Sequence, residues 1–345
     1  MSADFNGLGA AETVTLEGAA CAVELGGGAA ERQFKSLFAK ETSAGGAFVR
    51  QAVRFTTPFG KGKNDLPVEK GRYRLIVSRA CPWAHRQLIA LRLLGLEEVI
   101  SIGVVDPVRP KKPYSDWAFT LDAGGRDPVT GAEYLSDLYK QTDPLYADRF
   151  TVPAVIDLTT GKIVNNDYFN MTYYWEDAFS AFHKTGAPDL FPERLRDDIK
   201  ALNAVIFTDV NNGVYRAGFA AKQEAYEEAY DDVFRRLDEF EKRLESRRYL
   251  FGDDITDSDI RLWVTLARFD AAYYNAFRVN RNRLVDFPNL WGYARDLYQS
   301  PGFGETTDFD AIKRHYHLCC VPSNEYKLVP KGPDLSVWNT PHGRG

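Results

Sequence analysis

The sequence predicts an α/β domain followed by an all-α domain. Two observations support this prediction. Between residues 73 and 165, short β-rich runs alternate with helix-like segments. From residue 196 onward the strand patterns stop, and apolar residues recur every three or four positions, as they do on one face of a helix. A chain of 345 residues is long enough for two domains with separate cores.

The α/β half begins with a strand, a helix and a second strand. "YRLIVS" (73–78) is β-rich, and "PWAHRQLIALRLLG" follows as a predicted helix that ends at Gly95, since glycine is favoured at a helix C-terminus. "VISIGVV" (99–105) is typical of a second buried strand. The sequence therefore predicts a parallel β-α-β unit.

After a polar, proline-containing loop over 106–130, the order is helix, strand, strand, helix. "AEYLSDLYKQTD" (132–143) is helix-like, and "PAVID" and "KIV" (153–157 and 162–164) form a predicted hairpin before a helix from about 167. A parallel pair followed by an antiparallel hairpin gives a small mixed sheet with helices on both faces. That is the layout of a thioredoxin-like domain.

The second half contains only helical patterns. One apolar stripe steps by four and three along a predicted helix: Tyr226, Tyr230, Val233, Leu237, Phe240 and Leu244. A later helix is preceded by Thr256-x-x-Asp259, which resembles a capping box. We divide the chain into an N-terminal extension (1–45), a thioredoxin-like domain (46–180), a linker (181–195), an α-helical domain (196–320) and a C-terminal tail (321–345) that we expect to lie over the surface.

Composition excludes several classes of function. A net charge of −5 argues against nucleic-acid binding, which normally needs a basic face. No apolar run approaches the ~20 residues that cross a bilayer, and no basic segment precedes an apolar core at the N-terminus, so we expect a cytoplasmic protein. The spacing of the four cysteines gives no disulfide framework. Cys21, Cys319 and Cys320 fall in segments that the patterns place at the periphery.

Cys81 is the exception, because it stands where the first strand gives way to the first helix. Pro82 suits the first helical position, so Cys81 is the predicted N-cap, where the helix dipole stabilises a thiolate and lowers its pKa. Arg79, His85 and Arg86 would add positive potential, although we expect a structural role for His85. Ala84 occupies the place of the second cysteine of a dithiol enzyme, which favours monothiol exchange. A buried structural cysteine is the alternative.

Five segments together resemble a known family, the Xi-class glutathione transferases or glutathionyl-hydroquinone reductases. The similarity covers roughly residues 40–330 and rests on "ACPWAHR", "NNGVYRAGFA", "YLFGDDITDSDIRLWVTLARFD", "DFPNLWGYARDLYQ" and "DFDAIKRHYH". The resemblance implies a glutathione-transferase fold and a homodimer. It also implies that Cys81 attacks the sulfur of a thiol–hydroquinone thioether and that a second thiol molecule resolves the mixed disulfide.

The resemblance also implies roles for individual residues. Tyr215, Tyr316 and Tyr273 match tyrosines that hydrogen-bond the hydroquinone oxygens, although each could instead be a core aromatic. Trp117 matches a tryptophan of the thiol site. Pro153 matches the cis-proline of thioredoxin folds, so that the backbone of Val152 would pair with the cysteinyl unit of the thiol.

One part of the family pattern is different here. Where the family carries Asn-Glu-Ser, this chain has "NDY", which puts Asp167 and Tyr168 at the positions that hold the γ-glutamyl arm of glutathione. Asp is shorter than Glu, and a tyrosine ring would crowd the γ-glutamyl carboxylate. The co-substrate is therefore either glutathione, with Tyr168 turned outward, or a thiol without a γ-glutamyl group such as mycothiol, toward which we lean slightly.

Three functions remain open at this point. The first is a reductase of S-conjugated hydroquinones; the second is a general thiol–disulfide or dehydroascorbate reductase; the third is a non-catalytic transferase-like binding protein. "HYHLCC" (315–320) places two histidines and two cysteines together, but no second pair of ligands stands elsewhere, so we expect no metal.

Overall fold

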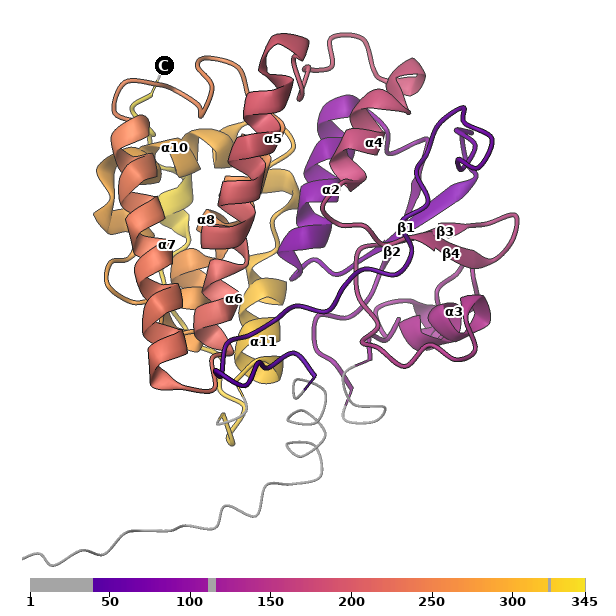
Figure 1. Ribbon diagram of the computed structural model, residues 1–345, viewed down its shortest axis with the longest axis horizontal. Helices are drawn as coiled ribbons and strands as arrows, with labels where there is room; N and C mark the ends of the chain where they lie inside the picture. Colours follow the sequence, from indigo (N-terminus) through magenta and orange to yellow (C-terminus); the bar gives the residue numbers. More distant parts are fainter. Residues whose placement is uncertain (1–39, 111–115, 322–323, 345) are drawn as a thin grey trace, which may run out of the picture.

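The computed structural model describes residues 40–110, 116–321 and 324–344. Its two halves stand side by side, the sheet in one and a bundle of helices in the other (Figure 1). The prediction of an α/β domain followed by an all-α domain is confirmed. Most of the predicted extension, together with Cys21, lies outside the described residues.

The sheet has four strands in the order β2-β1-β3-β4. The central strand β1 pairs in parallel with β2 and antiparallel with β3, and β3 pairs antiparallel with β4. The mixed sheet predicted from the sequence is thus confirmed. The strands are β1 (Tyr73–Val77), β2 (Ser101–Val104), β3 (Ala154–Asp157) and β4 (Lys162–Asn165). Every residue of β1 is buried, which fits a central strand with helices on both faces.

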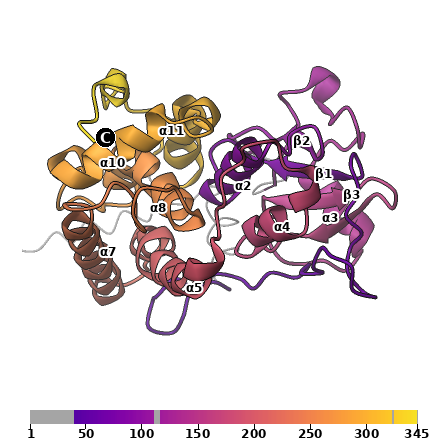
Figure 2. The same ribbon diagram turned by 90° about the horizontal axis from the view of Figure 1, so that it is seen from above.

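Three helices cover the sheet, with α2 and α4 on one face and α3 on the other (Figure 1). They are α2 (Pro82–Leu94), α3 (Leu135–Thr142) and α4 (Met171–Asp177). The predicted end of α2 is confirmed: Gly95 has φ = 76°, and its N–H donates to the carbonyl of Leu91. Both α2 and α4 face the helical half, so the N-terminal turn of α2 lies near the contact between the halves (Figure 2).

The helical half contains α5 (Arg196–Val205), α6 (Gly213–Gly218), α7 (Gln223–Arg243), α8 (Asp257–Arg268), α9 (Tyr274–Ala276), α10 (Pro288–Gln299) and α11 (Phe309–Cys319). The predicted capping box at Thr256 and Asp259 opens α8. Two π-helical segments, 206–211 and 269–273, were not predicted. Within the described part of the chain, no helix is long and apolar enough to cross a membrane.

Residues 41–59 form a strap that contacts both halves. The N–H of Ala221 donates to the carbonyl of Gly46 at 2.8 Å, and the N–H of Asn166 donates to the carbonyl of Phe55 at 2.8 Å. Figure 1 shows this segment passing beneath α6 and α11 on its way to the sheet. The predicted domain boundary placed residues 46–59 in the thioredoxin-like domain, whereas this segment also contacts the helical half.

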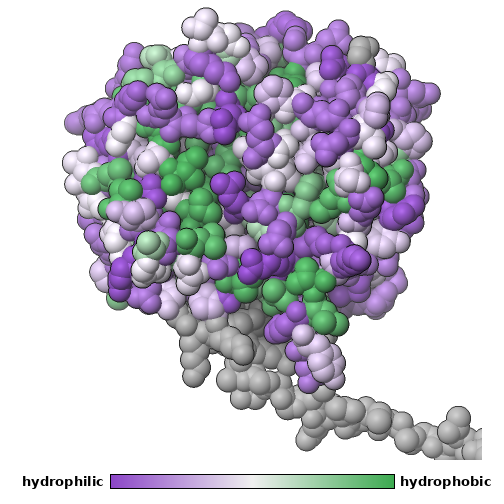
Figure 3. Space-filling view, turned by 180° about the vertical axis from the view of Figure 1, so that it is seen from behind, coloured by the Kyte–Doolittle hydropathy of each residue, from purple (hydrophilic) through white to green (hydrophobic). Residues whose placement is uncertain are grey.

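The C-terminal segment is anchored to the helical half by one buried ring. Trp338 is 5% exposed and packs edge-to-face on Trp291, with 4.9 Å between the ring centroids. Burial of so large a ring fixes the segment against α10. Elsewhere the surface is mixed, and Figure 3 shows separate apolar patches among polar side chains on one face.

Candidate active site

Cys81 lies at the N-cap of α2, as predicted. Its backbone is extended (φ −75°, ψ 121°), and Pro82 follows at the first helical position. The side chain is 8% exposed, and its S–H donates to the carbonyl of Val152 at 3.4 Å. The bond between Val152 and Pro153 is cis, in agreement with the match to the thioredoxin cis-proline.

The pKa of Cys81 differs from the sequence prediction. Burial raises the pKa of this thiol, whereas the backbone amides of Ala84 and Trp83 and the charges of Arg268 and Arg50 act in the opposite direction. The helix N-terminus is therefore present as predicted, but desolvation outweighs it. The expectation of a lowered pKa is wrong because the pocket wall removes water from the sulfur.

His85 is structural, as expected, and is linked to Arg268 of α8. Arg268 donates to Nδ1 of His85 at 3.1 Å, so the imidazole proton sits on Nε2, which donates to the hydroxyl of Thr306 at 2.9 Å. Burial and the nearby Arg268 hold the pKa of His85 well below its usual range, so the ring is neutral. It adds no positive potential at Cys81, contrary to the prediction.

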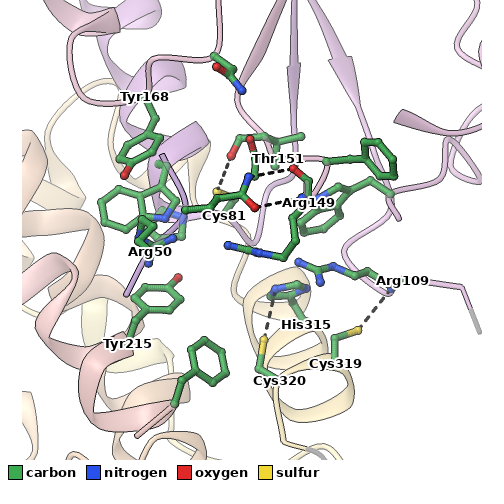
Figure 4. A pocket seen from close by; sticks show the side chains of 18 of the residues that line it. Arg50, Cys81, Arg109, Arg149, Thr151, Tyr168, Tyr215, His315, Cys319 and Cys320 are labelled. Atoms are coloured by element: carbon green, nitrogen blue, oxygen red, sulfur yellow. Dashed lines mark hydrogen bonds between the residues drawn. The ribbon is translucent and has the colours of Figure 1, made fainter. Parts of the chain in front are cut away.

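Cys81 opens into a pocket between the two halves (Figure 4). The space between its walls, including the part open to solvent, is about 870 Å³. The strap, the start of α2, the loop before β3, α6 and α11 all contribute to the walls. Three arginines line it (Arg50, Arg109 and Arg149), whereas no Asp or Glu belongs to the described lining. The pocket is thus electropositive and ringed with aromatic side chains.

The three predicted tyrosines meet through their hydroxyl groups. The hydroxyl oxygens of Tyr215 and Tyr316 are 2.6 Å apart, and those of Tyr273 and Tyr316 are 3.1 Å apart. Tyr215 and Tyr316 line the pocket, whereas Tyr273 is fully buried behind them. Burial raises the pKa of all three phenols, so they are protonated donors at neutral pH.

Of the residues matched to the thiol site, Trp117, Val152 and Tyr168 line the pocket. The Tyr168 ring packs on Trp83, with 5.0 Å between centroids. Asp167 does not reach the pocket among the residues described. Its carboxylate instead accepts from the backbone N–H of Phe169 (3.2 Å) and from the side-chain amide of Asn170 (2.8 Å), which stabilises the turn before α4.

Cys319 and Cys320, which were expected at the periphery, line the pocket. His315 Nδ1–H donates to the carbonyl of Pro107 at 2.7 Å, so Nε2 is free to accept the S–H of Cys320 at 3.5 Å. Burial raises the pKa of Cys320 to about 12 and lowers that of His315 to about 3, so both groups are neutral. One signal in the sequence pointed to Cys320: it stands four residues after Tyr316, a spacing that places two side chains on the same face of a helix.

These side chains form no metal site. The described residues contain no group of three or more His, Cys, Asp or Glu side chains placed to hold a metal ion. His315 and Cys320 are occupied by each other and by the carbonyl of Pro107.

Comparison with known proteins identifies the family. Residues 223–296 match the family model of the glutathione S-transferase C-terminal domain. The chain is 41% identical over 311 residues to the glutathionyl-hydroquinone reductase YqjG of Escherichia coli, covering 88% of this chain and 93% of that protein. The glutathione-bound structure of YqjG has a TM-score of 0.77 to this fold, with 84% of this chain and 94% of the other covered.

Two further structures agree. A glutathione transferase from Gordonia bronchialis is 52% identical (TM-score 0.78), covering 81% of this chain and 86% of that one. The Xi glutathione transferase of Phanerochaete chrysosporium is 40% identical (TM-score 0.80), covering 85% of this chain and 95% of that one. The fold, the order of the motifs and these identities over most of the chain lead to one conclusion: this protein belongs to the glutathionyl-hydroquinone reductases, the Xi class of the glutathione transferases.

Proposed function

We propose that this protein removes glutathione from glutathionyl-hydroquinone conjugates through a mixed disulfide on Cys81. The observation that carries the proposal is that one pocket holds both the Cys81 thiol and the hydrogen-bonded hydroxyls of Tyr215 and Tyr316. A thiol can attack sulfur, and neutral phenols can donate to a hydroquinone oxygen. The glutathione bound to YqjG, a relative 41% identical, supports the choice of thiol.

The chemistry proceeds in two exchanges. The hydroquinone ring reacts as its keto tautomer, in which a hydroxyl proton has moved to the carbon that bears sulfur. The Cys81 thiolate attacks the conjugate sulfur, the carbon–sulfur bond breaks, and its electron pair passes onto the ring oxygen. That ring takes up one proton and departs as the hydroquinone. A second glutathione thiolate then attacks the mixed disulfide, which forms glutathione disulfide and regenerates Cys81. The amides of Trp83 and Ala84, together with Arg268 and Arg50, favour the thiolate that both steps need.

The tyrosines act on the oxygen of the leaving hydroquinone. Tyr215 and Tyr316 donate to that oxygen as negative charge develops on it, and Tyr273 holds Tyr316 from behind through the 3.1 Å contact. A phenol suits this position because it donates without bringing a charge into an aromatic pocket.

Mycothiol is the second candidate thiol, and the observation that favours it concerns Asp167 and Tyr168. The Asp167 carboxylate is engaged by the turn before α4, and the Tyr168 ring forms part of the pocket wall. The usual partners of a γ-glutamyl arm are therefore replaced. Against this, mycothiol carries no carboxylate, whereas the pocket is lined by three arginines and, in its described part, by no acidic residue.

Intact-protein mass spectrometry distinguishes the two thiols. The protein is exposed separately to the glutathione and the mycothiol conjugates of one hydroquinone, with Cys81→Ser as the control. We expect the glutathionyl adduct on the protein and none on the variant. An adduct from mycothiol alone would reassign the thiol, and no adduct from either conjugate would contradict the proposed reaction.

A general thiol–disulfide or dehydroascorbate reductase would need Cys81 but not the phenols. The Tyr215→Phe variant separates the functions, because hydroquinone release should fall while reduction of a small mixed disulfide continues. Equal loss of both activities would contradict the proposed role of Tyr215.

We also propose that the protein is a homodimer in the cytoplasm, as its family resemblance implies. Size-exclusion chromatography with light scattering tests the first part, and a single-chain mass would contradict it. Fractionation of the source cells tests the second, and recovery outside the cytoplasmic fraction would contradict it.

A further inference from the structure

The three arginines of the pocket differ in what they contact. Arg149 is paired with Glu41, with 2.8 Å between guanidinium nitrogen and carboxylate oxygen. Arg50 donates to the side-chain oxygen of Asn212 at 2.9 Å and lies over the rings of Trp83 and Tyr215, 4.9 and 4.8 Å from their centroids. These two guanidinium groups are therefore held by partners within the protein.

Arg109 is held differently. Its guanidinium carbon lies 4.4 Å from the centroid of Trp117, but the side chain makes no hydrogen bond or ion pair with any of the described residues. Its backbone is nevertheless anchored, because the N–H donates to the sulfur of Cys319 at 3.4 Å. The charged end is thus placed at the pocket by the loop and by an aromatic face.

His315 and Cys320, two described titratable side chains beside Arg109, supply no compensating charge. The His315 ring is stacked on Trp117, with 5.2 Å between the ring centroids. Both His315 and Cys320 are neutral. Nε of Arg109 is buried without a hydrogen-bond partner, and the residue as a whole is half-buried. A half-buried cation without a counter-charge is costly, and a planar guanidinium matches the two oxygens of a carboxylate.

We propose that Arg109 is a specificity-determining residue that binds a carboxylate carried by the conjugate. The inference rests on the proposed function and deepens it, because it names the chemical group that the pocket selects. The carboxylate can belong to the thiol, as in glutathione, or to the aromatic ring of the hydroquinone. Trp117 links Arg109 to the matched thiol site, which favours the thiol as the source.

The test compares turnover of matched conjugates by the wild type, Arg109→Met, Arg109→Lys and Arg126→Met. Arg126 is the control, because it belongs to the same loop but is exposed and pairs with Glu133 at 3.0 Å, away from the pocket lining. The substrates are a neutral hydroquinone joined to glutathione, the same hydroquinone joined to N-acetylcysteamine, and a carboxylated hydroquinone joined to N-acetylcysteamine. Only the second lacks a carboxylate altogether.

We expect Arg109→Met to lower kcat/KM for the glutathione conjugate by about 10-fold to 100-fold, the range for one charge-assisted pair, and to leave the carboxylate-free conjugate within about twofold. Arg109→Lys should lose less, and Arg126→Met should match the wild type. A loss confined to the carboxylated hydroquinone would support the proposal with the ring as source. Equal losses for all three substrates, or none, would overturn it.

Equilibrium binding separates this inference from the proposed function. S-Methylglutathione carries the carboxylates but no hydroquinone to be released, so calorimetry with wild type and Arg109→Met reports the contact without turnover. We expect binding to the wild type to be about 10-fold or more tighter. Absence of wild-type turnover would refute the reductase. Equal S-methylglutathione affinities in the two proteins would exclude the thiol as the source of the carboxylate, and they would refute the role of Arg109 if the carboxylated hydroquinone conjugate showed no loss either.

Discussion

Arg268 of α8 donates a hydrogen bond to the carbonyl oxygen of Ala80 at 3.0 Å. Ala80 precedes the nucleophile, so a buried side chain of the helical half holds the turn that carries Cys81. The same guanidinium contacts His85, and its charge opposes the rise in the pKa of Cys81 that burial causes. The two halves are therefore joined at the turn that carries the reacting sulfur.

Replacing Arg268 should weaken both the fold and the nucleophile. We expect Arg268→Met to lose about 3 kcal/mol of unfolding free energy, because several buried acceptors lose their donor. The pKa of Cys81 should rise, so that its alkylation by iodoacetamide at pH 7.5 slows. Denaturant unfolding and rates from mass spectrometry measure the two effects. Arg54→Met, at an exposed strap residue, is the control, and unchanged alkylation in Arg268→Met would contradict the link.

The tyrosines should differ in their importance. Removing the hydroxyl of Tyr316 takes away a donor that lines the pocket, so Tyr316→Phe should lower kcat for hydroquinone release by about 100-fold or more. Tyr273→Phe removes only the supporting contact and should cost less. Stopped-flow measurement of hydroquinone appearance tests the order. A larger loss in Tyr273→Phe would reverse the assigned roles.

His315 should make the fold less stable in acid. Its folded pKa is about 3, below the usual 6.5, so between these values the unfolded chain binds the extra proton. The contribution of His315 to the free energy of unfolding is therefore complete above pH 6.5. It decreases as the pH falls below that value, by up to about 1.4 kcal/mol per pH unit. Unfolding in urea from pH 7 to 4.5 measures the slope. His315→Asn keeps a donor for the carbonyl of Pro107 and should reduce the slope of unfolding free energy against pH. An unchanged slope would mean that another group causes the loss of stability.

The identity of residue 168 should influence the choice of thiol. Tyr168→Ser removes a ring from the pocket wall and restores a small hydroxyl at the position where the family carries serine. We expect the ratio of kcat/KM for glutathione over mycothiol conjugates to rise by about 10-fold or more, as for one added hydrogen bond and relief of crowding. Competition between the two conjugates measures this ratio directly. A fall in the ratio would mean that the tyrosine itself binds glutathione.

Local features of the fold were predictable because their causes are local. Gly95 ends α2 and Thr256 with Asp259 opens α8 through interactions within a few residues of each terminus. The mixed sheet followed from a β-α-β unit and a hairpin whose strands are close in sequence. Cys81 was identified in the same way, since Pro82 marks the start of its helix.

Features set by distant contacts were not predictable. The raised pKa of Cys81 comes from burial by side chains of both halves, which a helix N-terminus in the sequence does not reveal. Cys319 ends α11 and Cys320 directly follows it, and only the packing of α11 against the sheet half brings them to the pocket. The π-helical segment 269–273 likewise sets the position of Tyr273, and no residue pattern indicated it.

The sharing of one pocket between two halves has a consequence for fragments of this chain. A cut in the connection at 181–195 would leave the sulfur on one polypeptide and the phenols on the other, so neither piece would contain a complete set of reacting groups. Recovery of activity on mixing would then report reassociation of the two pieces. The activity of the cut chain would therefore depend on the contact between its two domains and could be used to measure that contact.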